Sequence, residues 1–168
     1  MREGDGKMLE TEELQSLARS LAETPARVRE LVSSLPEMDA HWKPSAQEFS
    51  ALEHVCHLSD LEREGYAVRI EKLTRETDPF LPDFDGGRAA RERDYNSQSL
   101  STMLDTFALA RESNMRLISR LSAHDLQRSG TLENVGPITL QTLLHKMREH
   151  DEDHLQDLSR LSQQLLER

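Results

Sequence analysis

Apolar and polar positions alternate with a helical period over most of the chain, and the clearest stripe lies near the C-terminus. Its members follow one another at steps of three or four residues: Leu140, Leu143, Met147, His150, His154, Leu158, Leu161 and Leu165. This spacing keeps side chains on one face of an α-helix. The two exceptions to the apolar pattern are His150 and His154. His145 falls on the opposite side of the same helix, and we expect it to be an ordinary surface residue.

Two helices are predicted in the first half of the chain. The first covers roughly residues 14–35, and we expect it to be broken near Thr24-Pro25, because threonine is a good N-cap and proline is favoured in a first helical turn. The second begins at Ser50, which has capping-box spacing to Glu53, and runs to about Leu73.

The second half of the chain predicts two more helices and two long connections. Residues 100–121 carry apolar side chains on one face, and Thr139 can cap a fourth helix. Residues 74–97 and 122–137 instead show the proline, glycine and aspartate of turns. Four helices with two long connections predict an all-α protein with the architecture of a four-helix bundle, in which metal and ligand sites are built from facing side chains.

Composition limits the classes of protein that fit this pattern. With 168 residues, the chain suits one domain, which we place at residues 9–168 after a flexible polar tail at 1–8. The net charge of −10 argues against nucleic acid as a partner. No stretch approaches the roughly 18 apolar residues of a membrane span. The single cysteine, Cys56, cannot form an internal disulfide. We therefore expect a cytoplasmic protein with a small-molecule partner.

The histidines of the last helix suggest a metal site. Side chains four residues apart in a helix are neighbours, so His150 and His154 can share one ion. A third ligand is expected from another helix, since catalytic zinc sites commonly use three protein ligands and leave a fourth position open. The second helix offers His54 and His57, and its apolar arc favours His57 only modestly. The alternative is that His150 and His154 are core histidines satisfied by a carboxylate or a backbone carbonyl.

Several segments resemble a known family. Residues 42–44 (Trp-Lys-Pro) and 49–62 resemble the start of the second helix in the DinB/YfiT superfamily of metal-binding four-helix bundles. Residues 136–140 are similar to the lead-in to the last helix of that family, and residues 150–155 to its closing His-x-x-x-His pair. The resemblance extends over roughly residues 10–165. Phe49 stands where a tryptophan is frequent in the family.

The resemblance implies a ligand set and an activity. The histidine of the family's His-Leu-x-Asp segment is a metal ligand, and that residue here is His57, which would complete a mononuclear site with His150 and His154. Three neutral imidazoles suit several transition metals, of which zinc is our first candidate and nickel the second. Family members include metal-dependent thiol S-transferases, so the resemblance implies activation of a thiol or of water, with a low-molecular-weight thiol as possible co-substrate. It also implies a homodimer.

Other interpretations of the same residues stay open. The protein could be a non-catalytic metal-binding module for stress response or interaction, or a metal-dependent hydrolase. Arg111 and Asn114 interrupt the apolar face of the third helix and could hold an anionic group of the substrate. Alternatively, the arginine is paired with a buried acid such as Asp83 or Asp85. We expect Cys56 to be a core thiol, because adjacent residues of a helix diverge by about 100° and it cannot easily share an ion with the next residue.

Overall fold

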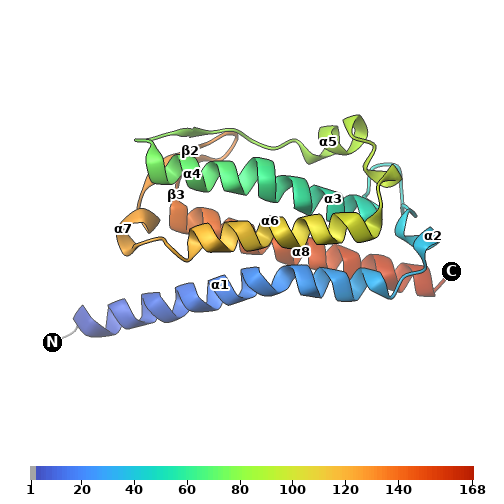
Figure 1. The fold of residues 1–168 in the computed structure, drawn as a ribbon, viewed down its shortest axis with the longest axis horizontal. Coiled ribbons are helices and arrows are strands. Elements are labelled where there is room, and N and C mark those ends of the chain that lie inside the picture. Colours follow the sequence, from blue (N-terminus) through green and yellow to red (C-terminus); the bar gives the residue numbers. More distant parts are fainter. Residues whose placement is uncertain (1–2) are drawn as a thin grey trace.

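Four long helical segments lie side by side and form the body of the protein (Figure 1). The structure is a computed structural model that describes the backbone of residues 3–168 and the side chains of residues 12–168. The segments are α1 (Glu3–Ser33), α3 (Ala51–Asp60) with its continuation, α6 (Leu100–Ile118) and α8 (Leu140–Leu166). The prediction of a four-helix bundle is confirmed.

The second of these segments is one helix with a wider turn inside it. Its α3 part continues through a π-helical turn, η1 (Leu61–Tyr66), into α4 (Ala67–Arg75). Such single π-turns are often found at functional sites. The predicted start is confirmed, because the Ser50 side chain accepts from the Glu53 backbone N–H and the Glu53 side chain accepts from the Ser50 backbone N–H.

The directions of the helices explain the long connection in the middle of the chain. Following the colours in Figure 1, α1 and α8 run in one direction, whereas α3–α4 and α6 run in the other. Because α4 ends at one end of the bundle and α6 starts at the opposite end, residues 76–99 must travel back along it. Bundles that place two consecutive helices in parallel need a crossover of this kind.

Both long connections contain short elements that the sequence did not predict. The first holds β1 (Phe80–Leu81), α5 (Gly86–Glu92) and η2 (Tyr95–Ser97), and the second holds α7 (Ala123–Leu126), β2 (Ser129–Leu132) and β3 (Gly136–Thr139). Strand β1 pairs in parallel with β2, which pairs antiparallel with β3. The remaining short helix, α2 (Glu37–Ala40), lies between α1 and α3. The small sheet thus joins the two connections.

The predicted break in the first helix is wrong, because α1 is continuous with Pro25 inside it. A proline has no N–H to donate to the carbonyl four residues earlier, which here belongs to Leu21. That carbonyl instead accepts from Nη1 of Arg111 at 2.6 Å. Thr24 does not cap a new helix; its hydroxyl lies 3.2 Å from the Ser20 carbonyl and 2.7 Å from a carboxylate oxygen of Asp151. Tertiary contacts therefore replace the hydrogen bond that proline removes.

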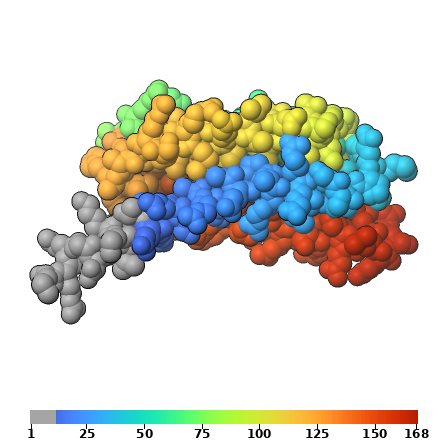
Figure 2. All heavy atoms as spheres, turned by 60° about the horizontal axis from the view of Figure 1, so that its bottom comes forward, coloured from blue at the N-terminus to red at the C-terminus, as the bar shows by residue number. Residues whose placement is uncertain are grey.

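Helix α1 lies along α6 and α8 over most of its length, as Figure 2 shows from another side. Part of the flexible tail predicted for residues 1–8 falls outside the described residues: the backbone description starts at Glu3, and no side chain before residue 12 is described. The tail therefore stays a prediction. Within the part of the chain that is described, no helix is both long and apolar enough to cross a membrane.

The apolar core is divided by a layer of polar side chains. The two larger apolar clusters include Leu21 and Met147 in one and Val28 and Phe107 in the other, and a third, smaller cluster surrounds Tyr95. Between the two larger clusters each of the four helical segments contributes buried polar groups, namely Thr24, His57, Glu62, Arg111, Asn114 and Asp151. Burial of polar groups is unfavourable unless they find partners, so this layer is the part of the core that requires an explanation.

Candidate metal centre

Three histidines meet where α3 faces α8, and they are the three predicted as metal ligands. The Nε2 atom of His150 lies 3.2 Å from Nε2 of His57 and 3.1 Å from Nε2 of His154. One ring nitrogen from each residue fits within a group whose members are all less than 4.8 Å apart. The structure therefore brings together one histidine of α3 and the two histidines of α8 that are one turn apart.

This spacing fits nitrogens that share one ion. Nitrogens bound at 2.0–2.1 Å to a tetrahedral zinc ion are about 3.3 Å apart, close to the separations between the Nε2 atoms. Hydrogen bonds alone do not satisfy the arrangement, since an imidazole nitrogen carries at most one proton and Nε2 of His150 faces two other ring nitrogens. Three imidazole donors that converge in this way suit a divalent transition metal.

The histidines are also in the protonation state that metal binding needs. Burial lowers the pKa of His57 to about 4, although the Asp60 carboxylate acts in the opposite direction. Burial, with the nearby His57 and Arg111, lowers the pKa of His150 to about 3. Burial also lowers the pKa of His154, and His150 adds to the effect. At neutral pH all three rings are therefore uncharged and can offer a lone pair.

The alternative of core histidines satisfied by the protein does not match the contacts. The Nδ1 atoms of His57 and His150 are buried and have no hydrogen-bond partner among the described residues. Nδ1 of His154 lies 2.7 Å from Nδ1 of His54, which is another imidazole rather than a carboxylate or a backbone carbonyl. Most buried polar atoms in proteins are paired, so the cluster lacks the hydrogen bonds that the alternative predicts.

Aromatic rings and a glycine enclose His57. The rings of Phe49 and Phe84 lie 5.6 and 5.9 Å from the His57 ring, centroid to centroid. Gly86, the first residue of α5, packs so closely that a Cβ built on it would lie 2.4 Å from Nδ1 of His57. The long connection between α4 and α6 therefore covers this ligand and leaves no room for a larger residue.

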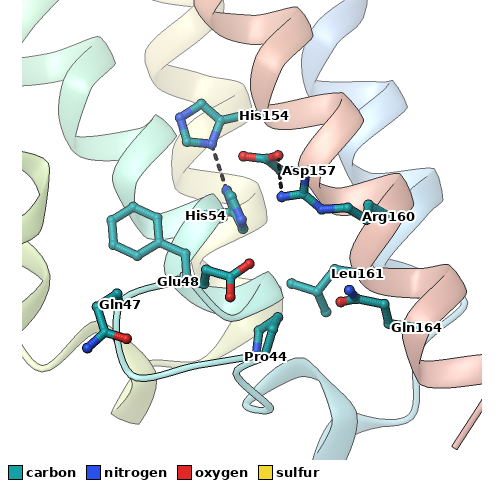
Figure 3. A pocket seen from close by; sticks show the side chains of 10 residues that line it. Pro44, Gln47, Glu48, His54, His154, Asp157, Arg160, Leu161 and Gln164 are labelled. Carbon is teal, nitrogen blue, oxygen red and sulfur yellow. Dashed lines mark hydrogen bonds and ion pairs between the residues drawn. The ribbon is translucent and has the colours of Figure 1, made fainter.

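A cavity of about 320 Å³ opens beside the histidines (Figure 3), within the range of small-ligand pockets. His54 and His154 form one wall, where their rings meet edge to face with their centroids 4.9 Å apart. The remaining lining is mostly polar and carries charges of both signs; it consists of Pro44, Gln47, Glu48, Phe49, Asp157, Arg160, Leu161 and Gln164. A polar small molecule could reach the edge of the histidine cluster through this cavity.

Arg111 and Asn114, which we predicted as possible substrate ligands, lie in the polar layer. Arg111 is 1 % exposed and donates at 2.7 Å to Glu62 and at 2.7 and 2.9 Å to the two oxygens of Asp151. Asn114 donates at 2.7 Å to the Glu62 carboxylate. Burial alone would lower the pKa of Arg111, but the carboxylates of Glu62 and Asp151 outweigh it and raise the pKa above its ordinary value.

These contacts agree with the alternative of a paired buried arginine, although with different acids from those we named. Asp83 is exposed and lies 3.6 Å from Arg69, and Asp85 caps α5 by accepting from the backbone N–H of Arg88. Neither Arg111 nor Asn114 lines the cavity beside the histidines. A substrate role for these two residues is untested and has no contact in its favour.

The predicted role of Cys56 as a core thiol agrees with the structure. It is fully buried, and its Sγ lies 3.7 Å from the Tyr95 carbonyl. Burial raises the pKa of this thiol to about 12, so it is protonated and unreactive at neutral pH.

Sequence reasoning weighed His54 only as a rival of His57, and it missed the buried acids Glu62 and Asp151. His54 precedes His57 by three residues, and this spacing places both on one face of a helix, a signal that could have connected them. Asp151 could have been found on a second stripe of α8, which runs through Leu144, Met147, Asp151, Leu155 and Leu158, all buried. The stripe that contains His150 and His154 lies beside this one and nearer to the surface.

Fold and site together define a four-helix bundle with a three-histidine candidate metal centre. A family model of the DinB superfamily matches residues 20–158, and the chain belongs to this superfamily. The fold is similar to that of YfiT from Bacillus subtilis, with a TM-score of 0.84 at 19% sequence identity, covering 92% of this chain and 88% of the other. YfiT is described as a probable metal-dependent hydrolase with an unusual four-helix bundle topology. A comparison with curated proteins gave no match.

Proposed function

We propose that the protein is a metal-dependent enzyme that holds one divalent ion with His57, His150 and His154 and uses it to activate a thiol or water against a small-molecule substrate. The observation that carries the proposal is the convergence of three neutral imidazole nitrogens with no fourth ligand in the same group among the described side chains. Three protein ligands are typical of catalytic sites, whereas structural zinc sites have four. Zinc is the first candidate ion and nickel the second.

The chain's own residues supply position and selectivity. His57, His150 and His154 would hold the ion, and a bound ion supplies Lewis-acid chemistry that lowers the pKa of a thiol or water reaching it. Phe49, at 5.6 Å from the His57 ring, helps to exclude bulk water. Across the adjacent cavity, Arg160 can attract an anionic group of a substrate.

The charges around the cavity favour a polar substrate with both signs of charge. Glu48 can attract a cationic group. Arg160, which pairs with Asp157 at 2.9 Å on one wall of the cavity (Figure 3), keeps further N–H donors that can bind a carboxylate. A low-molecular-weight thiol that carries an amino and a carboxylate group fits this pattern. We therefore place thiol transfer ahead of hydrolysis, in which water would take the role of the thiol. Hydrolysis is the probable activity in the description of YfiT.

The two forms of the proposal differ in one co-substrate, so an assay can separate them. Metal-free protein is reloaded with one equivalent of zinc or nickel and given a panel of electrophiles and ester or amide substrates, with and without cysteine-based thiols. Turnover that needs both metal and thiol supports the transferase. Turnover without thiol supports the hydrolase.

A matched pair of variants controls this assay. His154→Ala removes a ligand, whereas His145→Ala removes a histidine on the same helix whose side chain is 23% exposed and faces Glu13. We expect activity to disappear only in the first variant. Stoichiometric metal without turnover on any substrate in the panel would favour the non-catalytic binding module instead. The homodimer implied by the family resemblance is part of the proposal, and sedimentation analysis tests it separately.

A further inference from the structure

A fourth histidine touches the candidate metal centre without joining it. His54 lies on α3, is 5 % exposed, and places its Nδ1 atom 2.7 Å from Nδ1 of His154. This separation is shorter than the roughly 3.3 Å between nitrogens that share one tetrahedral ion, and it matches a hydrogen bond. His54 therefore meets the outer nitrogen of a ligand rather than the ion position.

The contact determines where the proton of His154 resides. A neutral imidazole carries one proton, and the nitrogen that binds a metal must offer its lone pair. Nε2 of His154 faces the other two ligands, so the proton belongs on Nδ1 and is donated to Nδ1 of His54. The proton of His54 is then on its own Nε2. The opposite arrangement would point the Nε2 proton of His154 into the site.

His154 is the one ligand for which the structure records such a partner. The Nδ1 atoms of His57 and His150 have no hydrogen-bond partner among the described residues, as noted above. The His54 ring itself is held by Phe49, which packs against it edge to face at 5.5 Å with an interplanar angle of 85°. Outer hydrogen bonds of this kind orient metal-binding histidines and fix their tautomer.

We propose that His54 is a positioning residue that accepts the Nδ1 proton of His154 and so directs the Nε2 lone pair of His154 toward the metal site. The inference rests on the proposed metal site but not on any particular reaction. Loss of an outer-shell partner typically weakens metal binding by about 10–100-fold.

The test compares zinc affinity in three variants, measured by competition with a chromophoric chelator. His54→Leu keeps the bulk and removes the acceptor. His54→Asn places an oxygen near the position of Nδ1 and keeps an acceptor. His145→Leu is the control on α8, away from the site. We expect a loss of about 10–100-fold for the leucine variant, recovery of most of that loss for the asparagine variant, and no change for the control.

A second measurement does not depend on variants. Nitrogen NMR of the metal-free wild-type protein at neutral pH should show His154 with its proton on Nδ1 and His54 with its proton on Nε2. The opposite tautomer of His154, or equal zinc affinity in wild type and His54→Leu, would overturn the inference. Neither readout uses catalysis, so lack of turnover would count against the proposed enzyme and leave this result standing.

Discussion

Two polar clusters share the layer that divides the core, and they differ in how completely their groups are paired. In the arginine cluster, Arg111 bonds to Glu62, Asp151 and a backbone carbonyl of α1, and opposite charges lie 2.7 Å apart. In the histidine cluster, next to it on α8, neutral rings face one another and two buried nitrogens have no partner among the described residues.

The difference shows which cluster needs a ligand. Arg111, Glu62 and Asp151 satisfy one another except at Nε of Arg111, which is buried without a partner among the described residues. Their contacts connect α1, α6, η1 and α8, so that cluster has little to offer a substrate. The histidines satisfy each other poorly, and their lone pairs converge on one point. A bound metal ion would give the converging Nε2 lone pairs a common partner. A ligand that entered the arginine cluster would instead have to displace existing ion pairs. We therefore assign the arginine cluster to the stability of the fold and propose the histidine cluster as the functional site.

The arginine cluster should give the largest effect on stability. Replacing Arg111 with Met leaves two buried carboxylates without their cation, and we expect the free energy of unfolding to fall by about 3–5 kcal/mol in urea titrations of the metal-free protein. Arg29→Met is the control, because Arg29 pairs with Asp105 at the surface, where such pairs contribute about 1 kcal/mol or less. Equal losses in the two variants would contradict the structural role of the cluster.

The histidine cluster should respond in the opposite way. His154→Ala should weaken zinc binding at least about 100-fold, beyond the effect typical of an outer-shell residue. The metal-free form of this variant should lose far less stability than Arg111→Met, since removal of a neutral imidazole leaves no buried charge without its partner. Isothermal titration and urea unfolding measure the two quantities. If the variant were strongly destabilised without metal and still bound zinc as wild type does, the histidine cluster would serve stability and not metal binding.

Acid should destabilise the metal-free protein through the same histidines. Burial lowers the pKa of His54 and His57 to about 4, against about 6.5 in the unfolded chain, so the unfolded state binds more protons as the pH falls through this interval. The contribution of these two histidines to the free energy of unfolding is fully present above pH 6.5 and is lost as the pH falls toward 4. We expect the free energy of unfolding to fall by about 2 kcal/mol for each of these two histidines between pH 7 and pH 5, and one of the two contributions to be missing in His54→Leu. A flat profile in urea unfolding would contradict these lowered pKa values.

Two adjacent glycines offer the smallest and most local test. Gly86→Ala would place a methyl group 2.4 Å from the His57 ring and should lower zinc affinity by about tenfold, within the range for residues that position ligands. Gly87→Ala should be harmless to binding, because its nearest neighbours lie at ordinary contact distances of 3.5 Å or more. Equal zinc affinities of the two variants would show that α5 does not fix the position of His57.

The sequence predicted what depends on local periodicity and on motif. The bundle, the caps at Ser50 and Thr139 and the three converging histidines follow from helical spacing and from the family resemblance. The sequence did not predict the features that depend on contacts between distant segments. Where Pro25 leaves the Leu21 carbonyl of α1 without its helical donor, Arg111 of α6 supplies one, and the small sheet forms where the two connections meet.

The central claim is that three histidines form a metal centre with an open position. X-ray absorption of the protein loaded with one equivalent of zinc tests it most directly. We expect three imidazole nitrogens at about 2.0–2.1 Å and one further light atom, which a bound thiol replaces with sulfur at about 2.3 Å. A closed shell of four protein ligands that no thiol changes, or zinc bound by fewer than three imidazoles, would contradict it.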